Sequence, residues 1–128
     1  MNKKVFACLL AVVMLLGMIV MPAAVKAEGE EAKEIVILYT NDVHCGVTDG
    51  MGYVGVARVK AALEAAGKEV ILVDNGDAVQ GDVIGTLSKG EAIVELMNDV
   101  GYDVAVIGNH EFDYGMEQFK KNVSLAKF

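Results

Sequence analysis

The stretch Val70-Ile-Leu-Val-Asp-Asn-Gly-Asp77 joins a short apolar run to a polar turn. A short apolar run bounded by turn-forming residues is typical of a strand buried in a parallel sheet. The turn after it carries two carboxylates, Asp74 and Asp77. In open α/β sheets, ligands bind outside the carboxyl ends of the strands. The stretch therefore predicts a buried strand, over residues 70–73, that ends at a functional site.

Two further apolar runs lie outward from this stretch in both directions along the chain. The run Ile35-Val-Ile-Leu-Tyr-Thr40 is continuously apolar and β-branched, which predicts a strand buried on both faces. Residues 103–107 form a similar run and predict a third strand. Each run is followed directly by polar residues. The chain thus delivers polar side chains after three predicted strands.

Helical periodicity separates these strands. One apolar stripe ends before Gly67, and a second ends before Gly101, which suits the position after a helix C-terminus. We expect a final helix over residues 116–126, and a mostly irregular, glycine-rich segment with one short helical turn over residues 75–89. The two stripes are Val56, Val59, Leu63 and Ala66, and Ile93, Leu96, Met97 and Val100. The alternation predicts an α/β fold with a largely parallel sheet.

The first 27 residues have the pattern of an export signal. Lys3 and Lys4 precede an apolar run over residues 5–21, and Val25 and Ala27 are small residues where a signal peptidase reads. We expect cleavage after Ala27, a flexible charged leader over residues 28–33, and a periplasmic, cell-surface or extracellular location. An uncleaved membrane anchor is the alternative, because the run reaches the lower end of the spanning length of about 17–25 residues. Membrane contact is expected only through this segment.

Charge limits the class of ligand. The chain has a formal net charge of −7, and every acidic residue lies at or after Glu28. Such a surface lacks the positive field that a nucleic acid polymer needs, so a polymer partner is not expected. A phosphate ester would need bound metal to offset the charge.

Cys45 is alone after the signal and is expected to be a small buried residue, with a metal ligand or reactive thiol as the alternatives.

The polar runs that follow the three strands contain side chains suited to metal ions. Asp42 and His44 are two residues apart, so both can point to the same side of an extended segment. Carboxylate and imidazole together suit zinc, manganese or iron. Asp77 could bridge two cations, and Asn109 offers a neutral carbonyl oxygen. Two divalent metal ions about 3.5–4 Å apart can activate water for attack at phosphorus.

Each residue also has a purely structural interpretation. Asp42 could cap a turn, a lone histidine is more often structural than a ligand, and Asp77 could belong to a plain turn. Asn109 could occupy a turn that requires a positive φ. The placement favours function, because three separate loops converge on one edge of the predicted sheet and hold both histidines of the chain.

The motifs resemble those of the calcineurin-like metallophosphoesterases. The segments concerned are Asn41-Asp-Val-His44, Asp74-Asn-Gly-Asp-Ala-Val-Gln-Gly81 with Gly85-Thr-Leu-Ser-Lys-Gly90, and Gly108-Asn-His-Glu-Phe-Asp113. More narrowly, they look like the secreted group of 5′-nucleotidases, UDP-sugar hydrolases and cyclic-nucleotide phosphodiesterases. The resemblance implies a layered α/β sandwich with largely parallel strands, incomplete at the C-terminus here, and residues 34–128 as a partial N-terminal catalytic domain.

The resemblance also implies a role for each matching residue. Asp42 and His44 would bind the first metal, Asp77 would bridge both metals, and Asn109 would bind the second. His110 would stabilise developing charge on the reacting oxygen as an imidazolium, with Asp113 orienting it. The substrate would be a small phosphate ester, most plausibly a nucleotide. Further ligands, and a domain that holds the nucleoside, would lie downstream of Phe128, so the chain is interpreted as an N-terminal fragment that is inactive by itself.

Two rival functions remain. Gly50-Met-Gly-Tyr-Val-Gly55 matches the glycine pattern of a dinucleotide-binding turn, but residues 42–49 separate it from the preceding strand, and the pattern needs the turn directly after the strand. The second rival is an exported, non-catalytic domain with a vestigial site. Neither the exact substrate nor the metal follows from the sequence.

Overall fold

The computed structural model describes residues 34–128. The expected signal peptide and leader, residues 1–27 and 28–33, lie outside the described residues. Within residues 34–128, the helices are too short or too polar to cross a membrane. The polar loops of interest all lie inside this described part of the chain.

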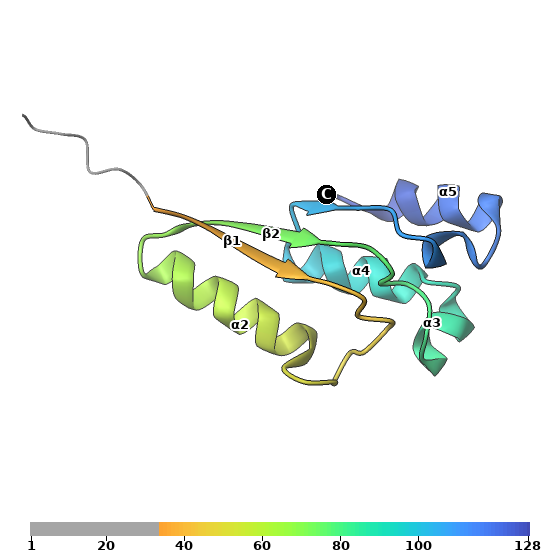
Figure 1. The fold of residues 1–128 in the computed structure, drawn as a ribbon, viewed down its shortest axis with the longest axis horizontal. Coiled ribbons are helices and arrows are strands. Elements are labelled where there is room, and N and C mark those ends of the chain that lie inside the picture. The colour runs from red at the N-terminus through yellow and green to blue at the C-terminus, as the bar shows by residue number, and fades with distance from the viewer. Residues whose placement is uncertain (1–33) are drawn as a thin grey trace, which may run out of the picture. The chain divides into compact units, whose positions relative to one another are not determined.

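Three parallel strands form one sheet in the order β1-β2-β3 (Figure 1). The strands are β1 (Ile35–Thr40), β2 (Glu69–Asp74) and β3 (Val104–Ala105). In the β1–β2 register Ile35 lies opposite Glu69, and Thr40 lies opposite Asp74. Because parallel neighbours need a crossover connection, a helix follows each strand. The predicted α/β class with a parallel sheet is confirmed.

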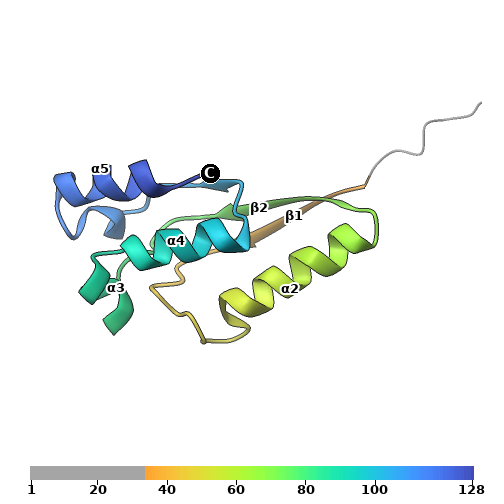
Figure 2. The ribbon, with the colours of Figure 1, turned by 180° about the vertical axis from the view of Figure 1, so that it is seen from behind.

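The helices are α2 (Gly52–Ala65), the short α3 (Val83–Ser88), α4 (Glu91–Val100) and α5 (Met116–Leu125), with a 3₁₀ turn, η1 (His110–Phe112). Two helices, α2 and α4, lie where the apolar stripes predict them, and α5 lies where the final helix is expected. Figure 2 shows α2 and α4 on the same side of the β1–β2 ribbon. α4 ends at Gly101 with a left-handed φ of 81°, as the predicted C-terminal glycine requires.

The core lies between the sheet and the helices α2 and α4. Its most buried side chains are Leu72 of β2 and Ile93 of α4, both 0% exposed. Cys45 is also fully buried, which confirms the small buried residue expected at that position. A Cβ atom on Gly85 would overlap the Cys45 sulfur, so the absence of a side chain at 85 lets α3 pack on this thiol. This core holds the loop after β1 against the loop after β2.

The expectation that the first strand is buried on both faces is wrong for the described residues. Ile37 and Tyr39 are 65% and 75% exposed, whereas Val36 and Leu38 are half-buried. Alternate side chains of a strand point to opposite faces. One face of β1 meets the helices, and residues 34–128 supply nothing to cover the other face.

The third strand is shorter than predicted. β3 comprises Val104–Ala105 rather than residues 103–107. Its partner β2 ends at Asp74, and the chain then turns through Gly76. The residues after Ala105 therefore have no strand residue beside them to pair with. Val106 still donates its N–H to the Asp74 carbonyl at 2.9 Å before the chain leaves the sheet.

Candidate functional site

Backbone hydrogen bonds join the loop after β1 to the loop after β2. The N–H groups of His44 and Cys45 donate to the carbonyls of Asp77 and Ala78 at 3.0 and 2.9 Å. The backbones of Asp42, His44 and Asp77 all have a positive φ, at 49°, 46° and 59°. Residues other than glycine rarely adopt this conformation, and it concentrates at functional sites. These bonds hold three predicted site residues in an otherwise unfavourable backbone geometry.

His44 is oriented by its own hydrogen bond. Its Nδ1 lies 3.0 Å from the carbonyl oxygen of Gln80. A carbonyl can only accept, so Nδ1 carries the proton and Nε2 keeps its lone pair. Nε2 lies 3.9 Å from Oδ1 of Asp42. A histidine held through one nitrogen with the other free is the usual arrangement of a metal ligand.

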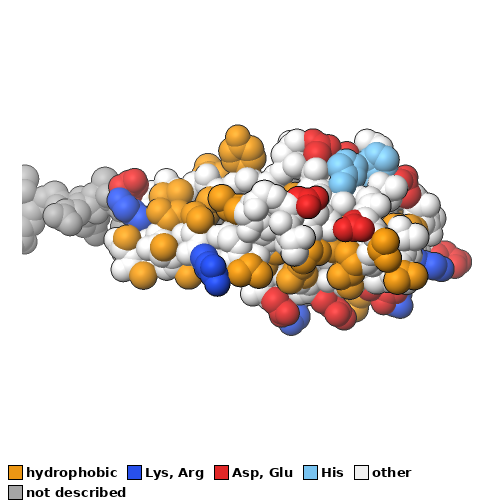
Figure 3. All heavy atoms as spheres, turned by 90° about the horizontal axis from the view of Figure 1, so that it is seen from below, with side chains coloured by type: hydrophobic (Ala, Val, Ile, Leu, Met, Phe, Trp, Pro, Cys, Tyr) orange, Lys and Arg blue, Asp and Glu red, His pale blue; other side chains and the backbone are white. Residues whose placement is uncertain are grey.

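Asp77 and His110 meet His44 at the same edge of the sheet. One ligand atom from each of these three residues lies within 4.8 Å of the others. The His44 and His110 rings are 5.0 Å apart and nearly perpendicular, and the N–H of His110 donates to Oδ1 of Asp77 at 2.8 Å. Figure 3 shows the two histidines of the chain side by side at the surface, with acidic side chains close by.

His110 and Asp113 form a hydrogen-bonded pair. Nδ1 of His110 lies 2.7 Å from Oδ2 of Asp113, and the 3₁₀ turn η1 brings the two side chains together. The hydrogen bond to Asp113 raises the pKa of His110, although partial burial opposes the shift. The contact with Asp113 thus stabilises the imidazolium form relative to a histidine without such a partner. Because Asp113 occupies Nδ1, Nε2 is the nitrogen left for chemistry.

The two remaining predicted ligands lie at the rim. Asp42 is exposed, and its carboxylate accepts a hydrogen bond from the Asn41 side chain. Asn109 is exposed and directly precedes η1 with a φ of −78°, so the turn interpretation that needs a positive φ does not apply to it. The structure thus brings His44, Asp77 and His110 together, with Asp42 beside His44 and Asn109 adjacent in the chain to His110.

Two acidic residues beneath the site carry a role that the sequence did not predict. Asp74 is 2% exposed; it accepts hydrogen bonds from the Thr40 hydroxyl at 2.8 Å and from the Gly76 N–H at 3.0 Å. Burial raises the pKa of its carboxyl group. Glu111 accepts from three backbone N–H groups of the site loops. Gly76 and Gly108 mark turns in which backbone N–H groups have no partner in the sheet. Such groups need acceptors, so these two turns were the sequence feature from which the roles of Asp74 and Glu111 could have been predicted.

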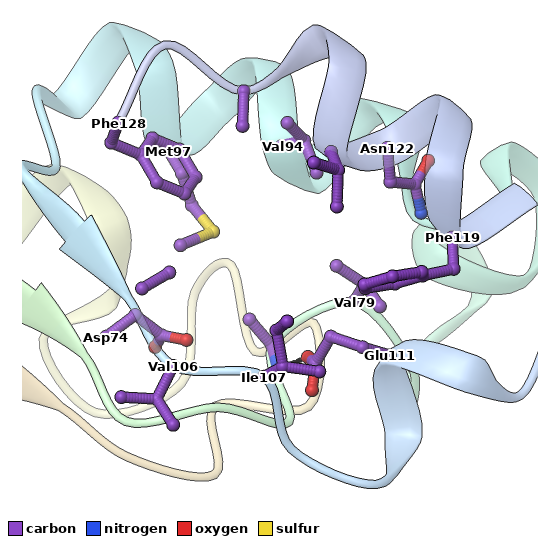
Figure 4. A pocket seen from close by; sticks show the side chains of 14 residues that line it. Asp74, Val79, Val94, Met97, Val106, Ile107, Glu111, Phe119, Asn122 and Phe128 are labelled. Atoms are coloured by element: carbon purple, nitrogen blue, oxygen red, sulfur yellow. Dashed lines mark hydrogen bonds between the residues drawn. The ribbon is translucent and has the colours of Figure 1, made fainter.

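A largely apolar cavity of about 200 Å³ lies under this edge of the sheet. Figure 4 shows Asp74 and Glu111 reaching it from one side, and Met97, Phe119 and Phe128 among its other walls. None of the six predicted site residues lines it. Since its walls are mainly apolar, the cavity does not suit a phosphate group, and the half-buried cluster of His44, Asp77 and His110 is the candidate site.

The cluster fits a divalent metal ion. His44 offers Nε2, Asp77 offers carboxylate oxygen, and both are held by hydrogen bonds at their other atoms. Imidazole with carboxylate is the donor set of zinc, manganese and iron sites. Gly108 allows the close approach, because a side chain there would overlap the Asp77 carboxylate. His110 has a free Nε2 and could serve either as a ligand or in proton transfer.

The structure disfavours the rival dinucleotide-binding interpretation. β1 ends at Thr40, and the glycine pattern begins at Gly50, so the glycines do not form the turn that follows the strand. Gly52 begins α2 and Gly55 lies inside it. A dinucleotide turn would place these glycines directly between strand and helix.

The parallel α/β fold and a cluster that could hold a metal ion agree with a phosphoesterase domain. The chain belongs to the calcineurin-like phosphoesterase family, whose family model matches residues 35–127. It is 41% identical over 96 residues to a snake venom 5′-nucleotidase of Gloydius brevicauda, a match that covers 65% of this chain and 16% of the relative. It is 36% identical to a 2′,3′-cyclic-nucleotide 2′-phosphodiesterase/3′-nucleotidase of Yersinia enterocolitica, covering 72% of this chain and 17% of the relative.

A solved structure agrees with this assignment. The NAD nucleotidase of Haemophilus influenzae superposes with a TM-score of 0.64 and 28% identity, over 72% of this chain and 19% of that one. The chain thus spans about a sixth to a fifth of the length of these proteins. The predicted family and fold are confirmed.

Proposed function

We propose that this chain supplies part of a two-metal site that hydrolyses small phosphate esters of the nucleotide class. The observation that carries the proposal is the convergence of His44, Asp77 and His110, whose ligand atoms lie within 4.8 Å of one another at one edge of the sheet. Membership of a phosphoesterase family supports the reaction class. The nucleotidase names of the relatives support the substrate class.

The family resemblance suggests a role for each metal-binding residue, and the contacts of His44 and Asp77 are compatible with those roles. Asp42 and His44 would hold one divalent ion, Asp77 would bridge to a second, and Asn109 would bind that second ion through its carbonyl oxygen. Bound metal would supply Lewis-acid charge and an activated water to the reaction. The Gln80 carbonyl keeps His44 in the tautomer that presents Nε2. Metal charge would also offset the acidic surface that otherwise repels a phosphate.

His110 and Asp113 would handle the leaving group. Attack of water at phosphorus breaks the ester P–O bond and leaves negative charge on the departing oxygen. Nε2 of the His110 imidazolium can stabilise that oxygen and give it a proton, while Asp113 fixes the ring through Nδ1 at 2.7 Å. We assign His110 to the reacting oxygen rather than to a metal ion, although one of its ring nitrogens lies within 4.8 Å of the ligand atoms of His44 and Asp77. The alternative, a vestigial site in a non-catalytic domain, predicts none of these effects.

Activity can be tested in a chimaeric protein that joins this chain to the rest of a relative. Residues 35–127 of this chain would replace the matching segment of the Yersinia enterocolitica phosphodiesterase/3′-nucleotidase, and hydrolysis of nucleotides would be assayed with manganese. We expect turnover from this graft and a loss of at least about 10³-fold with Asp77→Asn, because bridging charge is lost from the transition state. Asp99→Asn, at an exposed position of α4, is the matched control. Equal rates with and without Asp77→Asn would refute the proposed function.

We further propose that the protein is exported. The charged, apolar and small-residue pattern of residues 1–27 supports this, as does the venom origin of one relative. The test is to express the protein in a host whose outer compartment can be separated from the cytoplasm and to sequence the N-terminus of the protein found there. A mature N-terminus at Glu28 is expected. An intact Met1 in the membrane fraction would instead support an anchor.

A further inference from the structure

Glu111 lies between the two loops that carry the proposed ligands. It sits in η1, half-buried, immediately after His110. Its Oε2 accepts from the N–H groups of Asp77 and Gly108 at 3.1 and 2.6 Å, and its Oε1 accepts from the N–H of Ala78 at 3.0 Å. Hydrogen bonds to an ionised carboxylate are stronger than those between neutral groups. One side chain thus gathers three backbone donors.

Few other hydrogen bonds connect these loops. Within residues 34–128, the hydrogen bonds that join residues 75–80 to residues 106–113 all use the carboxylates of Asp77 and Glu111. The sheet adds little, because β3 has two residues and β2 ends at Asp74. Glu111 is therefore a main connection between the Asp77 loop and the Asn109–His110 loop.

The conformation of Asp77 makes this connection consequential. Its φ of 59° is unfavourable for a residue with a side chain, and such a conformation persists only when neighbouring contacts fix it. Glu111 accepts the N–H of this same residue. It also accepts the next N–H in the chain, that of Ala78. The carboxylate thus fixes the peptide planes on both sides of Asp77.

We propose that Glu111 is a positioning residue that clamps the Asp77 loop to the Asn109–His110 loop and so sets the distance between the proposed metal ligands. This inference rests on the proposed function, because what Glu111 positions is the proposed metal site. Glu111 itself need not contact metal or substrate, since both of its oxygens are occupied by backbone donors.

Two substitutions distinguish the hydrogen bonds that Glu111 accepts from the space that its side chain fills. Glu111→Ala removes all three acceptor contacts. Glu111→Gln keeps the shape and one oxygen, which can accept from two donors, but its amide nitrogen faces the third donor. Glu95→Gln is the matched control, because Glu95 is exposed on α4. The expected order of effect is Ala greater than Gln, with the control like the unaltered chain.

Amide hydrogen exchange measured by NMR on the full chain tests the clamp without metal. In Glu111→Ala we expect exchange of the Asp77, Ala78 and Gly108 amides to accelerate by about tenfold or more, the size of effect that loss of a hydrogen bond to a charged group produces. Exchange within α2 should stay within about twofold of the unaltered chain, which shows that the fold is intact. Unchanged exchange at all three amides in Glu111→Ala would overturn the proposal.

Manganese titration of the same variants tests the consequence for the site. Glu111→Ala should bind Mn²⁺ about tenfold more weakly or worse, with Glu111→Gln intermediate and Glu95→Gln unchanged. Faster amide exchange with unaltered Mn²⁺ affinity would overturn the positioning role. Absence of Mn²⁺ binding by the unaltered chain would contradict the proposed function instead, and the exchange result would still decide whether the clamp exists.

Discussion

Three single residues combine an unfavourable backbone conformation with a side chain that can bind metal: Asp42, His44 and Asp77. Each has a positive φ, which costs on the order of 1–2 kcal/mol for a residue with a side chain. The inter-loop hydrogen bonds of His44 and Cys45 offset this cost and fix where the side chains point. The convergence of His44, Asp77 and His110 could be predicted from the sequence. Their backbone conformations could not, because these depend on partners more than thirty residues away.

The His110–Asp113 pair makes a prediction that separates it from the metal ligands. In the graft described above, His110→Asn should lower kcat by about 10²–10⁴-fold, the usual range for general acid–base groups. Its metal content should stay near that of the unaltered graft, whereas Asp77→Asn should lose metal as well as activity. Metal analysis of the purified proteins beside kcat measures both. A loss of metal in His110→Asn as complete as in Asp77→Asn would instead make His110 a ligand.

A double-mutant cycle tests whether the pair acts as a unit. Asp113 is proposed to work through the His110 ring, at 2.7 Å from Nδ1. Asp113→Asn should therefore lower kcat alone but add nothing once His110 is already Asn. The kcat values of the two single variants and the double variant decide. Effects that multiply in the double variant would show that the two residues act independently.

Among the secondary structure elements, the sequence pattern predicted the features that depend only on neighbouring residues. The apolar stripes of α2 and α4 and the glycine after each helix are read from neighbouring residues, so their positions agree with the structure. The length of β3 and the exposed face of β1 were not predictable. Both depend on what lies beside the strand rather than on the strand itself, and an apolar run does not specify whether one or both faces are covered.

Asp103 gives a prediction about how β3 is held. Its Oδ2 accepts from the N–H of Leu72 at 2.8 Å and lies 3.3 Å from Nζ of Lys60. The hydrogen bond from Leu72 lowers the pKa of the Asp103 carboxyl group. A lowered folded-state pKa stabilises the fold above the ordinary carboxyl pKa, and this contribution is lost as the pH falls through the folded-state pKa. Asp103→Asn should therefore cost about 1 kcal/mol at neutral pH and progressively less in acid.

Urea unfolding of the full chain at several pH values measures this effect. The free energy difference between the unaltered chain and Asp103→Asn should shrink as the pH is lowered. Asp99→Asn, exposed on α4, serves as the control and should change little at any pH. A cost that is the same at neutral and acidic pH would mean that the carboxylate charge is not what holds β3.

At the scale of the whole described part, the sheet has one face covered by α2 and α4 and one face exposed. Five large apolar side chains, each about half exposed or more, lie on the strands or directly after β3: Ile35, Ile37, Tyr39, Val104 and Val106. Exposed apolar side chains and unpaired strand edges favour association. The net charge of −7 opposes it through mutual repulsion. The balance of the two effects should depend on ionic strength.

We therefore expect the isolated 128-residue chain to associate in a concentration-dependent manner, and more strongly when salt screens its charge. Sedimentation velocity at increasing protein and salt concentrations measures this. The double variant Ile37→Thr, Tyr39→Thr should shift the chain toward monomer, because threonine keeps a strand-compatible shape with less apolar area. Val54→Thr, at an exposed position of α2, should not. A monomer at every concentration and salt would contradict the account of this face.

The loops after three parallel strands are proposed to build one metal site, and metal binding by the chain itself is the simplest test of that proposal. Mn²⁺ would be titrated into the full chain, and free Mn²⁺ would be followed by its paramagnetic resonance signal. We expect weak but measurable binding, reduced by about tenfold or more in Asp77→Asn, because Asp77 is the proposed bridge between both ions. Asp99→Asn should bind like the unaltered chain. No binding by the unaltered chain, or equal binding by Asp77→Asn, would rule out a metal site built on Asp77.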